Sequence, residues 1–257
     1  MLELLKLRWR HGRPVIPDIE RAELMSTFHG FPVLDESACA AGCQACVEVC
    51  PTQAITKEPL ALDLGRCIFC MECERQCPSG AISFSSAYRL GASDREQLVV
   101  TSGLSADTYA EEAVRSRQEI VALFGRSLKL RQVSAAGCNG CELELAACGN
   151  VNFDMGRFGI DFVASPRHAD GIVITGPVSR NMAPALMDAY ASVPEPKLVI
   201  AVGACAISGG LFRESVELNR EGFNQFKVDL FVPGCPPHPL TFIHALLSYL
   251  TYIPVKS

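Results

Sequence analysis

Short apolar runs separated by turn residues dominate the chain from residue 128 onward. The runs DFVAS, GIVITGP, KLVIAVG and VDLFVPG, which begin at residues 161, 171, 197 and 228, are typical of strands buried on both faces. LKLRQVS, from residue 128, precedes them as a first strand. NMAPALMDAYASV and LTFIHALLSYL look helical. Strands that alternate with helices predict βαβ units, a parallel sheet and an α/β fold.

Residues 85–127 are mostly polar and show little apolar periodicity. Ala113, Ile120 and Leu123 recur at helical spacing, so one short helix is expected there. We interpret the stretch as a linker with its far boundary near 125, and we expect most contacts to lie within the parts on either side of it. The predicted division is 1–84, then the linker 85–127, then 128–257.

The amino-terminal stretch LELLKLRWRHGR mixes leucine and tryptophan with lysine and arginine, mostly in alternation. This pattern favours a strand, or an interfacial segment against a membrane subunit; a poorly ordered tail is the alternative. The stretch lacks the continuous apolar core and small-residue cleavage site of a secretory signal. The chain also has no run of 18 apolar residues, so we expect no membrane-spanning segment.

Composition narrows the classes of protein that fit. Among 257 residues, 49% are hydrophobic, the net charge is −5 and the pI is about 5.6, which argues against a nucleic-acid-binding protein. The 13 cysteines indicate either a disulfide framework or metal ligation. Without a secretory signal we expect a cytoplasmic, reducing compartment, where the cysteines serve as thiolate ligands.

A cysteine-rich unit occurs twice. CAAGCQACVEVCPTQAI begins at Cys39 and CIFCMECERQCPSGAI begins at Cys67, and from the second cysteine onward the two match at an offset of 27 residues. The second copy has the spacing of bacterial ferredoxins, in which three cysteines bind one 4Fe–4S cluster and the fourth binds the other. This region is therefore expected to be an α+β two-cluster ferredoxin domain. The predicted ligands are Cys39, Cys43, Cys46 and Cys77 for cluster 1, and Cys67, Cys70, Cys73 and Cys50 for cluster 2.

Two alternatives apply to this repeat. Structural zinc sites would favour two separated pairs of ligands, which the doubled four-cysteine run does not resemble. The first loop has one extra residue, between Cys39 and Cys43, so Cys39 is the least certain ligand and cluster 1 could be three-iron or labile.

The pair Cys138 and Cys141, in GCNGCELEL, lacks further ligands at motif spacing. Cys205 and Cys235 each follow a predicted strand directly, and ligands of open α/β sheets gather at the carboxyl ends of the strands. A helix starting at the pair would favour thiolates. These four cysteines are predicted to hold cluster 3, with Gly203 and Gly234 giving the loops room. A thioredoxin-like redox pair is the alternative, and Cys148 is interpreted as a spare core cysteine.

Four motifs in this half, GCNGCELEL, SPRHADGIVITGPVSRNM, AVGACAISGG and VPGCPPHP, together resemble the small subunit of membrane-associated nickel–iron hydrogenases. These are the group 4 enzymes, the energy-converting hydrogenases and formate hydrogenlyase. The small cluster-bearing subunit of complex I is similar, but it carries adjacent cysteines where Cys138 and Cys141 are spaced. Residues 1–85 resemble the two-cluster ferredoxin subunit of the same complexes, so the chain looks like a fusion of the two.

The resemblance implies a flavodoxin-like domain over 128–257 and an oxidoreductase subunit that relays electrons through three 4Fe–4S clusters. It implies a separate large subunit with the nickel–iron centre, membrane-arm subunits, and a donor or acceptor such as a ferredoxin or a formate dehydrogenase subunit. The complex would lie peripherally on the cytoplasmic side of the inner membrane. No G-x-G-x-x-G follows a strand, so no NAD site is expected by that route. The alternatives are a subunit of a complex I-like quinone oxidoreductase and a stand-alone ferredoxin-type carrier.

Several other polar residues near these motifs have candidate roles. By resemblance, an acid such as Glu142 or Glu144 would help move protons near cluster 3; the alternative is a solvated or subunit-paired carboxylate. Arg167 and His168 would either tune the cluster, face the large subunit or form a loop salt bridge. His238 is expected to begin a helix.

Overall fold

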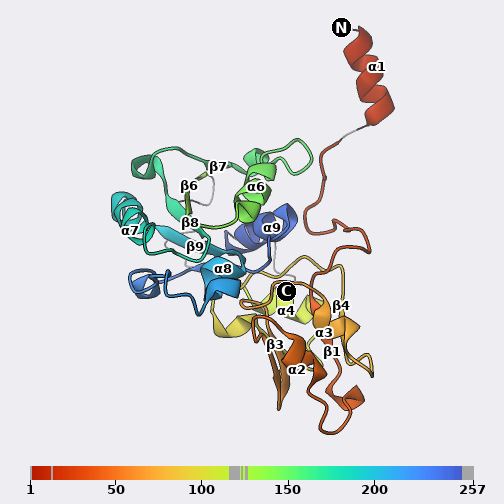
Figure 1. Cartoon of the computed structure of the whole chain (residues 1–257). Helices are drawn as coiled ribbons and strands as arrows, with labels where there is room; N and C mark the ends of the chain where they lie inside the picture. Colours follow the sequence, from red (N-terminus) through yellow and green to blue (C-terminus); the bar gives the residue numbers. More distant parts are fainter. Residues whose placement is uncertain (1, 13, 116–121, 123, 125–126, 251–257) are drawn as a thin grey trace.

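The computed structural model describes residues 2–12, 14–115, 122, 124 and 127–250. An amino-terminal helix, α1 (Leu2–His11), extends away from a two-part body (Figure 1). The part drawn lower in Figure 1 contains the cysteine repeat, and the upper part contains a five-stranded sheet. No helix in the described ranges is long and apolar enough to cross a membrane.

The ferredoxin-like part consists of two small antiparallel sheets and two short helices that carry the repeat. In each copy a helix starts between the cysteines and ends just before a Cys-Pro pair, because proline cannot continue the helix. One sheet pairs β1 with β4, and the other has the order β2-β3-β5. The elements are β1 (Pro32–Leu34), α2 (Ala45–Val49), β2 (Ile55–Lys57), β3 (Leu60–Asp63), α3 (Glu72–Arg75), β4 (Ile82–Phe84), β5 (Val99–Thr101) and α4 (Ala106–Glu112).

The second part is a parallel sheet with the order β7-β6-β8-β9-β10. Numbered from its own first strand this order is 2-1-3-4-5, that of flavodoxin-like doubly wound sheets, so the predicted α/β fold with a parallel sheet is confirmed. The elements are β6 (Leu128–Ser134), α6 (Gly140–Ala147), β7 (Ile160–Phe162), β8 (Gly171–Thr175), α7 (Ala183–Ser192), β9 (Leu198–Val202), α8 (Gly203–Ser208), β10 (Leu230–Val232) and α9 (Pro239–Tyr249).

The two faces of this sheet belong to different cores. On β8, Val173 joins the core under α6 and α9, whereas Ile172 and Ile174 join the core under α7 and α8. That second core continues into the ferredoxin-like part, where it includes Phe31 and Tyr109. Apolar side chains of both halves therefore pack together on this face.

Residues of the stretch predicted as a linker contact both halves of the chain. Strand β5 pairs with β3, and Tyr109 of α4 packs against Phe31 with ring centroids 5.2 Å apart. Ala92 exchanges two backbone hydrogen bonds with Phe231, of 2.8 and 3.0 Å, and so covers the outer edge of β10. This part of the stretch is structured, because β-branched and aromatic side chains hidden in a polar sequence find partners far away in the chain. Of the helix predicted around 113–123, Ile120 and Leu123 lie outside the described residues.

The amino-terminal segment is a helix, so the strand, one of the two interpretations of its alternating pattern, is wrong. It contains leucine, glutamate, lysine and arginine and no β-branched residue, a composition with high helix propensity. The Lys6 ammonium also pairs with the Glu3 carboxylate at 2.9 Å, a spacing of three residues that supports a helix. Trp9 is 90% exposed.

Candidate iron–sulfur sites and family

The first cysteine set, Cys39, Cys43, Cys46 and Cys77, lines one small cavity. Gly42 has a φ of +71°, a left-handed conformation that lets the longer first loop turn and keeps Cys39 at the cavity. Lys57, at the end of β2, lines the same cavity, and its hydrogen bond with the Cys39 sulfur raises the pKa of the lysine. Burial raises the pKa of the Cys46 thiol in this set, and the charge of Lys57 opposes that rise.

The second cysteine set, Cys50, Cys67, Cys70 and Cys73, lines a separate cavity with an apolar surround. Burial raises the pKa of the Cys67 thiol far above its usual range and that of Cys73 to about 12. Thiols this desolvated ionise only when a positive ion compensates for the lost water, which is what iron ligation does.

Backbone N–H groups point at sulfur in both repeat copies. The Ala54 N–H donates to Cys50 Sγ at 3.2 Å, and the Ala81 N–H donates to Cys77 Sγ at the same distance. In the second set the Phe69 N–H also donates to Cys67 Sγ, at 3.3 Å. Such bonds stabilise thiolate sulfur and tune the potential of a bound cluster.

The third cysteine set, Cys138, Cys141, Cys205 and Cys235, gathers at the carboxyl edge of the five-stranded sheet. Cys141 lies in the first turn of α6, Cys205 lies in α8 directly after β9, and Cys235 follows β10. Burial, the neighbouring Glu142 carboxylate and the other three thiols together raise the pKa of Cys141 to about 12. The four thiols therefore lie within electrostatic reach of one another.

Glycines make room for these sulfurs. Gly203 has a φ of +87°, and a Cβ there would lie 2.6 Å from Cys141 Sγ. A Cβ on Gly210 would lie 2.9 Å from Cys205 Sγ. Gly203 and Gly234 were predicted from the sequence, whereas Gly210 was missed; its signal was the Gly-Gly pair that follows α8.

The donor sets suit iron–sulfur clusters in their chemistry. Each is made of four thiols, the ligands of 4Fe–4S clusters, and the first and second sets also have a lysine or backbone N–H groups directed at sulfur. Within the described residues, no three Cys, His, Asp or Glu side chains are grouped as a site for a single metal ion.

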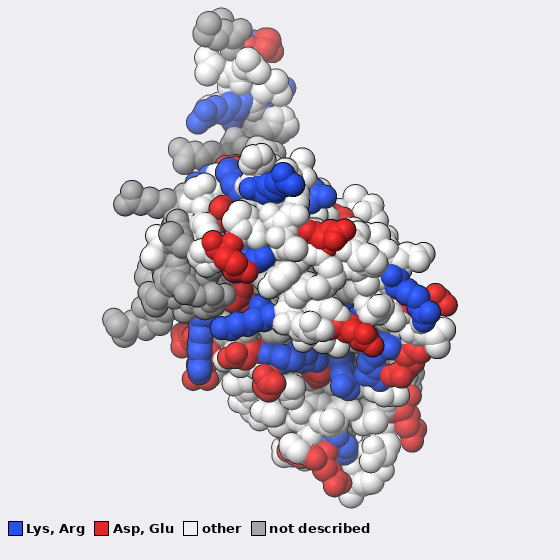
Figure 2. Space-filling model, turned by 90° about the vertical axis from the view of Figure 1, so that its left-hand side faces the viewer, with Lys and Arg blue, Asp and Glu red and all other residues white. Residues whose placement is uncertain are grey.

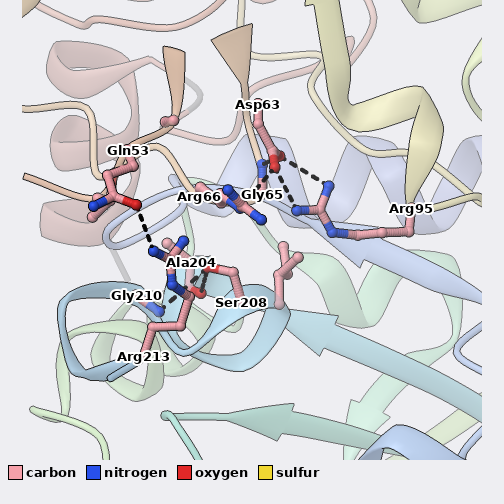
Figure 3. A network of polar contacts seen from close by, with 12 residues as sticks. Gln53, Asp63, Gly65, Arg66, Arg95, Ala204, Ser208, Gly210 and Arg213 are labelled. Atoms are coloured by element: carbon pink, nitrogen blue, oxygen red, sulfur yellow. Dashed lines mark hydrogen bonds and ion pairs between the residues drawn. The ribbon is translucent and has the colours of Figure 1, made fainter. Parts of the chain in front are cut away.

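The second and third sets lie within electrostatic reach of each other. Partial desolvation raises the pKa of the Cys235 thiol, although the residue as a whole is exposed; Cys138 and then Cys70 of the second set raise it further. Arg213 donates to the Gln53 side chain at 2.9 Å, which ties the loop after α8 to the loop after Cys50 (Figure 3). The same view shows that both carboxylate oxygens of Asp63 accept hydrogen bonds from the Arg95 guanidinium. This pair of bonds holds the end of strand β3 in the ferredoxin-like part.

Three further candidate residues, Glu142, Glu144 and Cys148, lie on or directly after α6, the helix that carries Cys141. Burial alone would raise the pKa of Glu142, but hydrogen bonds from Ser134 and Thr175 outweigh it and the net shift is downward, so the carboxylate is ionised at neutral pH. Burial raises the pKa of Glu144. Cys148 is fully buried in the core under α6 and α9, where its thiol donates to the Glu144 carbonyl at 3.4 Å.

Arg167 and His168 are exposed in the turn before β8, at the amino end of the strand, whereas the third set lies at the carboxyl ends. Their predicted role in tuning the cluster therefore receives no support from their position. His238 caps α9, as expected, and its Nδ1 accepts the Leu240 N–H at 3.2 Å.

Comparison with known proteins shows which family has these features. Residues 138–249 match the family described as NADH ubiquinone oxidoreductase, 20 Kd subunit, and residues 60–83 match the 4Fe-4S binding domain. The probable membrane-bound hydrogenase subunit mbhJ of Pyrococcus furiosus is 40% identical over 132 residues, which cover 51% of this chain and 79% of that protein. The chain belongs to the family of the NADH ubiquinone oxidoreductase 20 Kd subunit.

Other relatives in the family come from both of its branches. Formate hydrogenlyase subunit 7 of Escherichia coli is 36% identical over 60% of this chain and 61% of its own length. An NADH-quinone oxidoreductase subunit of Roseiflexus is 44% identical over 42% of this chain and 41% of its own length. The predicted fusion of a ferredoxin-type region with this family is confirmed, and the chain is a subunit of a hydrogenase or complex I-type oxidoreductase.

Proposed function

We propose that this chain is the electron-transfer subunit of a membrane-associated nickel–iron hydrogenase complex. The observation that carries the proposal is the contact between the two parts: Arg213, in the loop after Cys205, donates to the side chain of Gln53, in the loop after Cys50, at 2.9 Å, and Cys70 lies within electrostatic reach of Cys235. The spaced pair Cys138 and Cys141 favours the hydrogenase branch over a quinone-reducing, complex I-like one.

In this proposal each cysteine set holds one 4Fe–4S cluster, and the clusters supply one-electron transfer when bound. The chain's own residues hold and insulate them: the apolar surround of the second set excludes water, and backbone N–H groups donate to sulfur. Lys57 places a positive charge at the first set. The sets follow one another from first to second to third, and the third is the most exposed, with Cys138 and Cys235 at the surface.

That exposed edge is the proposed docking face for a large catalytic subunit. The side chains of Leu211, Phe212 and Val216 follow Cys205 in the chain and are 50–76% exposed. A surface with several exposed apolar side chains beside the third set is typical of a subunit contact. By analogy with the relatives, the partner would hold the nickel–iron centre and would exchange electrons with this edge.

We also propose peripheral attachment to the membrane arm of the complex, on the cytoplasmic side. Helix α1 carries Lys6, Arg8 and Arg10 with exposed leucines and Trp9, a composition typical of interfacial helices (Figure 2). Over the body, in the view of Figure 2, acidic and basic side chains are interspersed.

Anaerobic purification of the chain with its partner subunits tests the proposal. We expect about twelve iron atoms and as many sulfides per chain, the content of three 4Fe–4S clusters, and nickel in the associated large subunit. Zinc in place of iron, or about eight irons or fewer after reconstitution, would refute the three-cluster proposal. A complete complex without nickel that reduces quinone would assign the chain to the complex I-like alternative.

A further inference from the structure

Arg220, in the loop between α8 and β10, directs its guanidinium at four backbone carbonyls. One nitrogen donates to the carbonyls of Pro177 and Cys205 at 3.2 and 3.1 Å. The other donates to those of Ala206 and Ile207 at 2.6 and 3.3 Å. No motif in the sequence marked this residue, and it takes part in neither the ligand sets nor the ferredoxin-like part.

Three of these carbonyls belong to α8, the six-residue helix that carries Cys205. The last carbonyls of a helix lack intrahelical partners and form its negative end. A helix this short has little stability of its own. The planar fork of an arginine can bind several of these carbonyls at once, which a lysine cannot do. Arg220 therefore fixes the turn from which Cys205 reaches the third set.

The charge of Arg220 is unusual in its surroundings. The guanidinium is partly buried and lies 4.7 Å from the centre of the Phe223 ring. Within the described part of the chain, its polar contacts are carbonyls, with no ion pair to an aspartate or glutamate. Burial lowers the pKa of Arg220 to about 10, against an opposing effect of Cys205, so the residue stays charged at neutral pH. A charge sequestered without a carboxylate is costly unless another negative group compensates for it.

We propose that Arg220 is a positioning residue of the third cysteine set, which holds the Cys205 turn rigid and stabilises the reduced state of the cluster bound there. The inference rests on the proposed function, in which this set binds a 4Fe–4S cluster. One-electron reduction adds one negative charge to the cluster, supplied through the second set, and no bond to the protein changes. A fixed cation beside Cys205 lowers the free energy of that more negative state.

The test is a redox titration of the holoprotein followed by EPR, together with the temperature at which each cluster is released. Arg220→Met removes both the charge and the planar guanidinium group, whereas Arg220→Lys keeps a positive charge but loses the guanidinium group. Arg180→Met is the matched control, because Arg180 is an exposed arginine that donates to the Val216 carbonyl in the same region. We expect Arg220→Met to shift the midpoint potential of the third cluster to a more negative value, with the two ferredoxin clusters and the control unchanged.

Selective loss of the third cluster in Arg220→Met, with the other two retained, would also support the positioning role. If that variant does not fold, Arg220→Lys decides: a third cluster with near-native potential that is released at a lower temperature supports the proposal. Native potential in Arg220→Met, or a native release temperature in Arg220→Lys, would overturn it. A wild-type chain whose third set binds no cluster would instead refute the proposed function, and this inference with it.

Discussion

At the scale of single residues, Cys148 is the cysteine that we assign to the core and not to a cluster. Its thiol is fully buried between α6 and α9 and donates to the Glu144 carbonyl, a bond that a serine hydroxyl can also make. We expect Cys148→Ser to retain the EPR signals of all three clusters, whereas Cys235→Ser loses only that of the third. A missing signal in the Cys148 variant would show that the ligand assignment is wrong.

The sequence predicted functional residues wherever their chemistry depends on spacing along the chain. The cysteines of the repeat lie within short loops, so their spacing alone groups most of them. Lys57 and Arg220 had no such signal, because each acts on a sulfur or a carbonyl that is distant in sequence. Their roles depend on where β2 ends and where the loop after α8 returns.

At the scale of elements, helix α9 packs against the segment that follows the ferredoxin-like part, and His244 lies at this contact. Burial, together with the nearby charge of Arg89, lowers the pKa of His244 from 6.5 to about 4. The ring of Tyr88 lies edge-on at 6.1 Å, and Ser248 Oγ lies 3.5 Å from Nδ1. Folding therefore favours the neutral imidazole.

The unfolded chain takes up this proton once the pH falls below about 6.5, while the folded chain does not until about pH 4. We expect stability to be full above pH 6.5 and to fall by roughly 2 kcal/mol by pH 5 through this residue. The measurement is denaturant unfolding of the anaerobic holoprotein at pH 7.5 and pH 5. His244→Asn should weaken the loss, and His168→Asn, at an exposed histidine, should not. Equal losses in wild type and His244→Asn would exclude the contribution.

At the scale of the whole molecule, the two parts share a core and a sheet edge. A Cβ on Gly65 would lie 2.8 Å from the side chain of Ile207 on α8, and a Cβ on Gly91 would lie 2.4 Å from that of Ala245 on α9. Burial of one large apolar side chain is worth about 1.5–3 kcal/mol, so exposing a few of them approaches the stability of an entire domain. The parts are therefore expected to depend on each other.

A specific protease site near residue 105, between β5 and α4, tests this dependence. We expect the nicked chain to elute as one particle with its clusters intact, because both fragments contribute to the shared core. The carboxyl fragment produced alone should be insoluble or should lose its cluster. A soluble carboxyl fragment that keeps its cluster would show instead that the parts are independent.

The sequence by itself determined the cysteine sets, the five parallel strands and the kinship of the chain. Ligand spacing, strand periodicity and loop motifs are local properties, which short segments encode without reference to distant ones. It did not determine that α1 is a helix, because an alternating pattern over ten residues competes with helix propensity, which left a strand and an interfacial segment both open. Only the tertiary structure decided that residues 85–115 join both parts, that Cys70 lies near Cys235, and that Arg220 binds the helix of Cys205. These contacts join segments tens to more than a hundred residues apart, and their formation depends on how whole faces pack rather than on any pattern along the chain.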